Sequence, residues 1–337
     1  MKMSKNVDFK SLGFRDIEMH EFPNIINIEV YRGDCYCSCV HCPVGTTEPG
    51  KRKERFGERG MDLELYKKIV AEMSQHPHST VRVHSVGEPL IWENLAEALQ
   101  FTHDNGVIPW IFTCAATNDT DLLEAICDNT NFVEVSVNSV TPDDYKATKG
   151  VDAFEIVSGN IQRMHDYIRD KGLATRLIAS RVESLNKTAD EEFVRYWKDS
   201  GLVDDAFIRS YHTYNDILPK LPGEAQHKHE PCLVHWARFN ISVDGYAVVC
   251  FNELFKEHLD PSLVFGNLRE QSIAEIWHGP KLTALRRAEL SGDYSTLPFG
   301  EALPCKDCYS CQPLLGKRQT SEYQIRQFWV SKNGKER

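Results

Sequence analysis

Strand-like and helix-like segments alternate along the chain from residue 25 to about residue 215. Runs rich in β-branched and aromatic residues predict strands at residues 25–31, 80–86, 109–114, 132–137, 174–180 and 205–211. Amphipathic stretches separate them, and two of these end in the helix-closing sequences HDNG and RDKG. Repeated strand–helix units form a parallel sheet with right-handed crossovers, and six units are too few for an eight-stranded barrel. The sequence therefore predicts an α/β fold, a partial (β/α)6 TIM-like barrel with its chemistry at the C-terminal ends of the strands.

Charge and hydropathy narrow the class of partner. The 337 residues carry a formal net charge of −10, which argues against a nucleic-acid partner because phosphate binding needs a basic surface. No apolar run approaches the ~20 residues that span a bilayer, and the sequence MKMSKNVDFK lacks the apolar stretch of a signal peptide. We expect a cytoplasmic protein without a membrane partner.

A polar linker, PKLPGEAQHKHEP at residues 219–231, marks a change of pattern. Beyond it, NISVDGYAVVC predicts a hairpin that turns at Asp244 and Gly245. These features predict the following division: an N-terminal extension at 1–24, a barrel at 25–218, the linker, a small cysteine-rich domain at 232–315 and a tail at 316–337.

Most of the eleven cysteines fall into groups, which is typical of metal sites. The groups are Cys35, Cys37, Cys39 and Cys42; Cys232 and Cys250; and Cys305, Cys308 and Cys311. In the first group, Cys35, Cys39 and Cys42 have CX3CX2C spacing directly after the first predicted strand. Three thiolates on one loop can hold three irons of a four-iron cluster and leave the fourth open to a small molecule. A structural zinc site, completed by Cys37 or His41, is the alternative.

The two C-terminal groups predict a second, fully ligated site. Cys232, Cys250, Cys305 and Cys308 can fill either a tetrahedral zinc site or a four-iron cluster, and spacing alone does not choose between them. Cys311 is left over as an alternative ligand, a buried thiol or a hydrogen-atom donor.

The CX3CX2C loop after the first strand of a partial barrel resembles the radical SAM superfamily. The resemblance implies that Cys35, Cys39 and Cys42 bind a 4Fe–4S cluster whose unique iron is chelated by S-adenosylmethionine. It implies reductive cleavage of that cofactor to a 5′-deoxyadenosyl radical, with a flavodoxin- or ferredoxin-type electron donor. Cys37 falls in the variable spacer and is not expected to be a ligand.

Three further segments resemble cofactor-binding elements of the same superfamily. HSVGEPL resembles its GGEP element, VSVNSVTPDDYKATKG resembles its fourth-strand segment, and ASRVESLN stands where the family often places polar contacts. The resemblance assigns cofactor contacts to His41, Gly87, Glu88, Pro89, Ser136, Asn138 and Arg181. Two positions depart from the family pattern: Val86 replaces the first glycine of GGEP, and Asn138 replaces an acid.

The C-terminal cysteines and the segment VFGNLREQSIAEIWHGPKLTALR resemble the SPASM/twitch extension of radical SAM enzymes, which carries auxiliary iron–sulfur clusters. The last group is too short for two clusters, and no cysteine follows Cys311. The resemblance therefore implies one auxiliary 4Fe–4S cluster of the twitch type, held by Cys232, Cys250, Cys305 and Cys308.

An auxiliary cluster can accept an electron, as in twitch-bearing alcohol dehydrogenases of the superfamily. We therefore expect a radical SAM oxidoreductase that dehydrogenates a small molecule, such as a sugar, an aminocyclitol or a nucleotide-sugar. Peptide-modifying members often carry an extra N-terminal domain, and only 24 residues precede the first strand here. The alternatives are a carbohydrate epimerase or dehydratase, a sulfatase-maturase-like enzyme acting on a peptide, and, outside enzymes, a zinc-stapled scaffold.

Substrate-facing residues are expected where the sixth strand ends, in RSYHTYN. The candidates there are Arg209, Tyr211, His212 and Asn215, and we assign catalytic roles to Tyr211 and His212. Glu253, the carboxylate nearest the second auxiliary cysteine, is the predicted catalytic base. The basic run KRKER at residues 51–55 predicts a solvated face, with an anionic substrate as the alternative.

Overall fold

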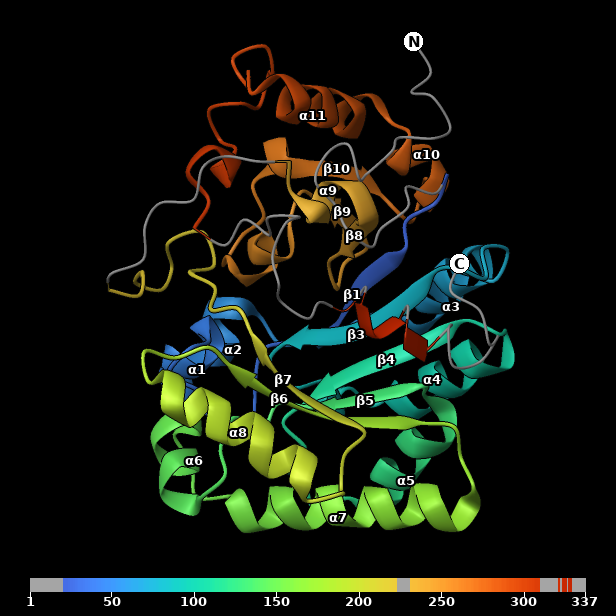
Figure 1. Cartoon of the computed structure of the whole chain (residues 1–337). Helices are drawn as coiled ribbons and strands as arrows, with labels where there is room; N and C mark the ends of the chain where they lie inside the picture. Colours follow the sequence, from blue (N-terminus) through green and yellow to red (C-terminus); the bar gives the residue numbers. More distant parts are fainter. Residues whose placement is uncertain (1–20, 223–230, 310–320, 322, 326, 329–337) are drawn as a thin grey trace.

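The structure is a computed structural model that describes residues 21–222, 231–309, 321, 323–325 and 327–328. Within this part of the chain, one ten-stranded sheet organises the molecule (Figure 1). Its barrel strands are β1 (Ile25–Arg32), β3 (Thr80–Val86), β4 (Ile108–Thr113), β5 (Phe132–Val135), β6 (Arg176–Val182) and β7 (Asp205–Arg209). They pair in that order and in parallel, and the two-residue β2 (Arg59–Gly60) pairs antiparallel with β1. The predicted partial (β/α)6 barrel is confirmed.

Helices follow the strands and cover the outer face of the barrel (Figure 1). They are α1 (Pro43–Thr46), α2 (Arg52–Phe56), α3 (Leu63–Met73), α4 (Leu95–Asp104), α5 (Thr120–Asn129), α6 (Pro142–Lys149), α7 (Phe154–Lys171) and α8 (Lys187–Asp199). Short 3-10 turns lie at η1 (Pro49–Lys51) and η2 (Pro89–Ile91). Side-chain caps begin several helices: Asp62 accepts a hydrogen bond from the Leu65 amide, and Thr141 accepts one from the Asp144 amide. Gly172, in the left-handed conformation, ends α7 as its sequence predicts.

The C-terminal part adds three strands to the same sheet. These are β8 (Arg238–Ile241), β9 (Tyr246–Val248) and β10 (Val264–Asn267), and the predicted hairpin is the antiparallel pair β8–β9. β8 also pairs in parallel with β1, and a hydrogen bond of 2.8 Å joins the side chains of Asn27 and Asn240 across this pair. Around the strands lie α9 (Leu233–Ala237), η3 (Phe251–Phe255), η4 (Pro261–Leu263), α10 (Ile273–Trp277), α11 (Pro280–Ser291) and η5 (Pro304–Asp307). The cysteine-rich region is therefore continuous with the barrel sheet.

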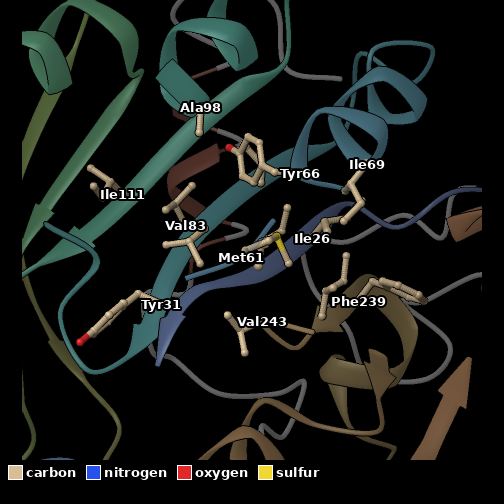
Figure 2. Close-up of a cluster of buried hydrophobic side chains, with 14 of the residues drawn as sticks. Ile26, Tyr31, Met61, Tyr66, Ile69, Val83, Ala98, Ile111, Phe239 and Val243 are labelled. Carbon is tan, nitrogen blue, oxygen red and sulfur yellow. The ribbon is translucent and has the colours of Figure 1, made fainter. Parts of the chain in front are cut away.

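The hydrophobic core also joins the two regions. Figure 2 shows Phe239 and Val243 of the C-terminal part beside Ile26 of β1 and Met61 before α3, and all four belong to one buried cluster. Each is at most 4% exposed. Because this apolar surface is shared, the cluster fixes the cysteine-rich region against the strand that leads into the first cysteine loop.

Residues near the C-terminus pack on the opposite, inner face of the sheet. Ile325 and Phe328 join a buried cluster with Trp110 of β4 and Phe132 of β5, and the rings of Phe328 and Phe132 lie 5.2 Å apart. This part of the predicted tail therefore closes the inner side of the barrel at the N-terminal ends of its strands. In the part of the chain that the structure describes, no helix combines the length and the apolar character needed to cross a bilayer.

Candidate functional site

The first cysteine group lies on the loop between β1 and α1, at the C-terminal end of the parallel strands (Figure 1). Cys35, Cys39 and Cys42 are brought together there, with Cys37 and with Cys114 from the end of β4. The sulfur atoms of Cys35 and Cys114 and a carboxylate oxygen of Glu88 all lie within 4.8 Å of one another. Cys114 was not predicted as a site residue, although it closes a predicted strand at the catalytic end of the barrel.

Cys37 and Cys42 occupy different surroundings. Cys37 is 1% exposed, and its sulfur lies 3.7 Å from the hydroxyl of Tyr145. Cys42 precedes the first turn of α1; burial raises the pKa of its thiol, while the amides of Gly45 and Val44 act against that rise. Amide donors at a helix start favour a thiolate and so partly offset the burial of Cys42, whose role as a ligand stays a prediction.

The surroundings of Lys149 indicate whether the first cysteine group fits an iron–sulfur cluster. Its side chain is buried, and the ammonium donates a 2.6 Å hydrogen bond to the Ser136 carbonyl. Burial disfavours its charge, but the sulfurs of Cys39, Cys37 and Cys114 raise the pKa of Lys149 well above its usual value. An unexposed cation is stable only beside negative charge, and of these three residues Cys39 would carry such charge as a thiolate bound to iron. The donor set therefore fits an anionic cluster.

The basic run at residues 51–55 is not the fully solvated face that its sequence predicts. Arg52 is 2% exposed, so it is not part of a solvated face. Its guanidinium donates to the carbonyl of Cys35 at 2.9 Å and to the hydroxyl of Ser38 at 2.6 Å. Arg52 therefore fixes the cysteine loop, because five donors in a planar fork can bind several carbonyl and hydroxyl groups at once. Lys51 and Lys53 are exposed, as the pattern predicts.

Glu88 and Gly87 lie directly after β3, against the cysteine loop. Glu88 is 2% exposed; its two oxygens accept hydrogen bonds from the Thr113 hydroxyl at 2.6 Å and the Cys114 amide at 2.9 Å. Burial raises the pKa of this carboxyl, against the hydrogen bonds that favour its charge. Pro89 begins η2 behind it. The arrangement presents an oriented carboxylate beside Cys35, as a site for an ammonium group requires.

Gly87 is required by the backbone here. Its φ is 142°, and a Cβ atom at this position would collide with the carbonyl oxygen of Asp34. We expect Gly87→Ala to lower the free energy of unfolding by about 3 kcal/mol, because backbone strain and overpacking add. Urea denaturation measures the change.

Gly159 provides the matched control for this substitution. It lies in the interior of α7, and an added Cβ would meet no atom within 4 Å. Gly159→Ala is therefore expected to raise the free energy of unfolding by about 1 kcal/mol through helix propensity. Equal effects of the two substitutions would contradict the assigned role of Gly87.

Ser136 and Asn138 follow β5 and hold the strand ends together. Asn138 has a left-handed φ of 62°, which asparagine tolerates. Its amide nitrogen donates to the Ser136 hydroxyl at 2.8 Å, and its oxygen accepts from the Val182 amide at 2.7 Å. Ser136 also accepts a hydrogen bond from Lys149, and the contact of both Ser136 and Asn138 with a cofactor stays a prediction.

Arg181 and His41 flank the same region. The buried Arg181 forms ion pairs with Asp190 at 2.9 Å and with the partly exposed Asp144 at 2.8 Å, so its guanidinium is engaged within the fold. Burial, together with the charges of Lys149 and Arg181, lowers the pKa of His41 to about 3. The ring is therefore neutral at pH 7, which suits packing against an uncharged heterocycle. Both assignments as cofactor contacts stay predictions.

The cysteines of the second group interact electrostatically in the structure. The thiol of Cys305 is buried, and its pKa is raised by burial, by Glu289 and by the sulfurs of Cys250, Cys232 and Cys308. Such mutual repulsion between thiols is relieved when a metal binds them as thiolates. The charges of the four predicted ligands suit a metal centre, and their assignment as ligands stays a prediction. Cys311 lies outside the described residues.

Glu253 lies in η3, three residues after Cys250. The carboxylate is 1% exposed, and one oxygen accepts hydrogen bonds from Asn215 at 2.8 Å and from Lys256 at 2.7 Å. The other oxygen is buried and has no hydrogen-bond partner among the described residues. An unpaired buried carboxylate oxygen is costly in a folded protein, which is typical of a group that acts on a ligand.

The other residues predicted to face substrate lie after β7. The Tyr211 hydroxyl donates to the Pro219 carbonyl at 2.8 Å. Burial, with the charge of Arg238, lowers the pKa of His212 to about 4, so this ring is neutral at pH 7. Arg209 pairs with Glu134 inside the sheet. Of this group, the structure brings Asn215 directly to Glu253, whereas Arg209 is held by the sheet.

Two family models match the chain. One describes the radical SAM superfamily and covers residues 32–187; the other describes an iron–sulfur cluster-binding domain, SPASM, and covers residues 232–312. Among curated proteins, the chain is similar to an S-adenosyl-L-methionine-dependent 2-deoxy-scyllo-inosamine dehydrogenase from Niallia circulans. Identity is 27% over 291 residues, which are 86% of this chain and 94% of that protein.

Solved structures share the fold. BtrN in complex with AdoMet and 2-DOIA matches with a TM-score of 0.50 at 18% identity, over 88% of this chain and 96% of that one. SuiB from Streptococcus suis, bound to the precursor peptide SuiA, matches with a TM-score of 0.62 at 12% identity, over 80% and 67% of the two chains. Native anSMEcpe with bound AdoMet matches with a TM-score of 0.58 at 12% identity, over 91% and 96%.

Proposed function

Since this chain belongs to the radical SAM superfamily and carries a SPASM-type iron–sulfur domain, we propose that it oxidises an alcohol of a small molecule to a carbonyl compound. Sugars, nucleotide-sugars and aminocyclitols are the substrate classes we favour. The similar protein from Niallia circulans is by name a dehydrogenase of an aminocyclitol, which supports this reaction. The complex of BtrN with 2-DOIA is consistent with a small-molecule substrate.

The cofactors are S-adenosylmethionine, the cluster that binds it and an auxiliary cluster. We propose Cys35, Cys39 and Cys42 as ligands of the first cluster, and Cys232, Cys250, Cys305 and Cys308 as ligands of the second. When bound, the cofactor supplies a 5′-deoxyadenosyl radical that removes a hydrogen atom from carbon, and the auxiliary cluster supplies an electron acceptor. Glu88, oriented by Thr113 and Cys114, would receive the cofactor's ammonium group.

One observation carries the proposal of oxidation: a buried carboxylate oxygen without a partner lies on the segment that follows an auxiliary cysteine. After an alcohol carbon loses a hydrogen atom, the carbonyl forms when the hydroxyl loses a proton and the radical loses an electron. Glu253 would take the proton, and the site built on Cys250 would take the electron. An epimerase needs a hydrogen-atom donor instead of this base.

Neighbouring residues orient the carboxylate of Glu253. Asn215 and Lys256 donate to the same carboxylate oxygen, which leaves the second oxygen free to accept a proton. We propose that Tyr211 and His212 contact the substrate from the end of β7.

We propose a flavodoxin- or ferredoxin-type protein as the electron donor. The first cysteine loop supports this choice, because Tyr36 is 41% exposed and Val40 is 59% exposed beside buried cysteines. Exposed apolar side chains on a cofactor loop suit transient contact with a partner protein.

Glu253→Gln tests the proposal in the enzyme reconstituted with both clusters. We expect the rate of carbonyl formation to fall by about 100-fold or more, because general bases contribute roughly that factor. Formation of 5′-deoxyadenosine should persist, since hydrogen-atom removal precedes loss of the proton. Anaerobic assays on a panel of sugars and aminocyclitols, with both products quantified, measure the two steps separately.

Glu257→Gln is the matched control, because Glu257 lies four residues on and its side chain is 60% exposed. It should retain carbonyl formation. Product made in deuterated water should carry no deuterium at the reacting carbon. Deuterium at that carbon, with inverted configuration, would contradict oxidation and indicate an epimerase. No carbonyl product from any alcohol in the panel, with a peptide modified instead, would contradict the proposed substrate class.

A further inference from the structure

A buried histidine spans the space between a carboxylate and a predicted auxiliary ligand. His235 lies on α9, three residues after Cys232, and is 2% exposed. Its Nδ1 lies 2.6 Å from an oxygen of Glu289, and its Nε2 lies 3.9 Å from the sulfur of Cys305. Neither His235 nor Glu289 belongs to a cysteine motif, so the sequence alone did not single them out.

Glu289, on α11, fixes the orientation of this ring. Its first oxygen accepts hydrogen bonds from His235 and from the Cys232 amide at 3.2 Å, and its second accepts from the Trp236 indole at 2.8 Å. Three donors on one buried carboxylate leave it little freedom to rotate. The Glu289 carboxylate on one side and an iron-bound sulfur on the other are both acceptors, so both ring nitrogens carry a hydrogen: Nδ1 donates to Glu289, and Nε2 faces Cys305.

Arg286 completes the support behind the ring. Its Nε donates to the His235 carbonyl at 2.8 Å, and a second nitrogen donates to the Trp277 carbonyl at 2.9 Å. The guanidinium also lies 3.9 Å from the centre of the Trp277 ring. His235 is therefore held through both its side chain and its backbone, as a hydrogen-bond donor to a fixed acceptor must be.

We propose that His235, positioned by Glu289, donates an N–H···S hydrogen bond to Cys305 and thereby raises the reduction potential of the auxiliary cluster. An iron-bound cysteine sulfur has no proton to donate, so a contact between it and Nε2 is a hydrogen bond in which the ring is the donor. Hydrogen bonds to cluster sulfurs stabilise the more negative, reduced state and so raise its potential. The inference rests on the proposed function for its purpose: a higher potential makes the cluster a better acceptor of the substrate's electron.

The test is a redox titration of the full chain, followed by electron paramagnetic resonance. Cys35, Cys39 and Cys42 are replaced by alanine in every sample, so that the auxiliary cluster gives the signal. In this background, we expect His235→Phe to lower the midpoint potential. The expected change in the one-electron equilibrium is tenfold or more, which corresponds to about 59 mV. His235→Gln, which keeps an N–H donor, should restore part of the potential.

Glu289→Gln and His278→Phe complete the comparison. Glu289→Gln should shift the potential in the same direction as His235→Phe but by less, because the ring loses its orienting charge and keeps its donor. His278→Phe should leave the potential unchanged, because His278 follows α10 and contacts the Glu21 carbonyl. Iron content reports whether each variant holds its cluster. If His235→Phe loses its cluster, the potentials of the milder His235→Gln and Glu289→Gln variants test the inference.

An unchanged midpoint potential in all three His235 and Glu289 variants, with full iron content, would overturn the inference. So would loss of one iron in His235→Phe with a 3Fe–4S signal, because His235 would then be a ligand. Neither readout uses a substrate. A lowered potential in the variants of a chain that oxidises no alcohol would therefore support the role of His235 and reject the proposed function. An unchanged potential in a chain that does oxidise an alcohol would reject the role of His235 and leave the proposed function intact.

Discussion

Replacing Cys42 with alanine is expected to abolish 5′-deoxyadenosine formation, whereas replacing Cys37 with alanine is expected to preserve it. The structure makes this contrast necessary, because Cys37 lies in the same buried thiol group as Cys39 and Cys114. Proximity alone would therefore admit either cysteine as the third ligand. The CX3CX2C spacing selects Cys42.

The physical reason for the large effect is coordination. Three protein thiolates leave one iron open to the cofactor, and loss of one thiolate opens a second iron and destabilises the cluster. Cys37→Ala removes buried contacts with Tyr145 and with the neighbouring thiols and should cost about 1–2 kcal/mol of stability. Deoxyadenosine is quantified after anaerobic reaction of reconstituted protein with S-adenosylmethionine and dithionite, and iron and sulfide are counted in the same samples.

Two controls accompany these variants. Cys127→Ala, a buried cysteine of α5 outside every cysteine group, should change neither iron content nor deoxyadenosine formation. The triple variant of Cys35, Cys39 and Cys42 should retain about four irons, those of the auxiliary cluster. Deoxyadenosine formation by Cys42→Ala at the rate of the unaltered protein, or complete loss of iron from the triple variant, would refute the ligand assignment.

The barrel was predictable because its signals are local. Each buried strand is a short run of β-branched and aromatic residues, and glycines such as Gly172 end the helices between them. The pairing of β8 with β1 was not predictable, because it joins segments more than two hundred residues apart and depends on apolar contacts such as Phe239 with the barrel core. The packing of Phe328 inside the barrel depends on Phe132 in the same way.

The residues of the site also differ in whether a local sequence signal reveals them. Cys35, Cys39, Cys42 and the sequence Gly87-Glu88-Pro89 stand out because their spacing reflects the chemistry of one loop. Cys114 and Lys149 reach the same place from other strands, where only the topology of the sheet brings them together. The expectation that Arg52 is exposed was wrong. A run of charged residues usually predicts exposure, but the guanidinium of Arg52 binds the cysteine loop. Lys149 belongs to the segment VSVNSVTPDDYKATKG, which resembles a cofactor-binding element, but its neighbours along the chain do not indicate that its side chain is buried.

Lys149→Met is expected to lower the reduction potential of the first cluster and to slow deoxyadenosine formation by at least tenfold. The ammonium is buried, and among the described residues no carboxylate forms an ion pair with it. Unit charges ~4 Å apart attract by about 4 kcal/mol at an effective dielectric of ~20. Removing the cation withdraws such stabilisation from the thiolates and most strongly from the reduced cluster, which carries one more negative charge.

The same substitution should have the opposite effect on the protein without its clusters. There Lys149 is a buried cation among thiols, and a methionine of similar length removes the cost of burying it. We therefore expect Lys149→Met to raise or preserve the free energy of unfolding of the cluster-free chain while it impairs the reconstituted enzyme. Lys149→Arg should recover part of the potential. Lys146→Met, on the same helix but 66% exposed, should change neither quantity. A potential unchanged by Lys149→Met would show that the charge is balanced by something other than the iron-bound thiolates.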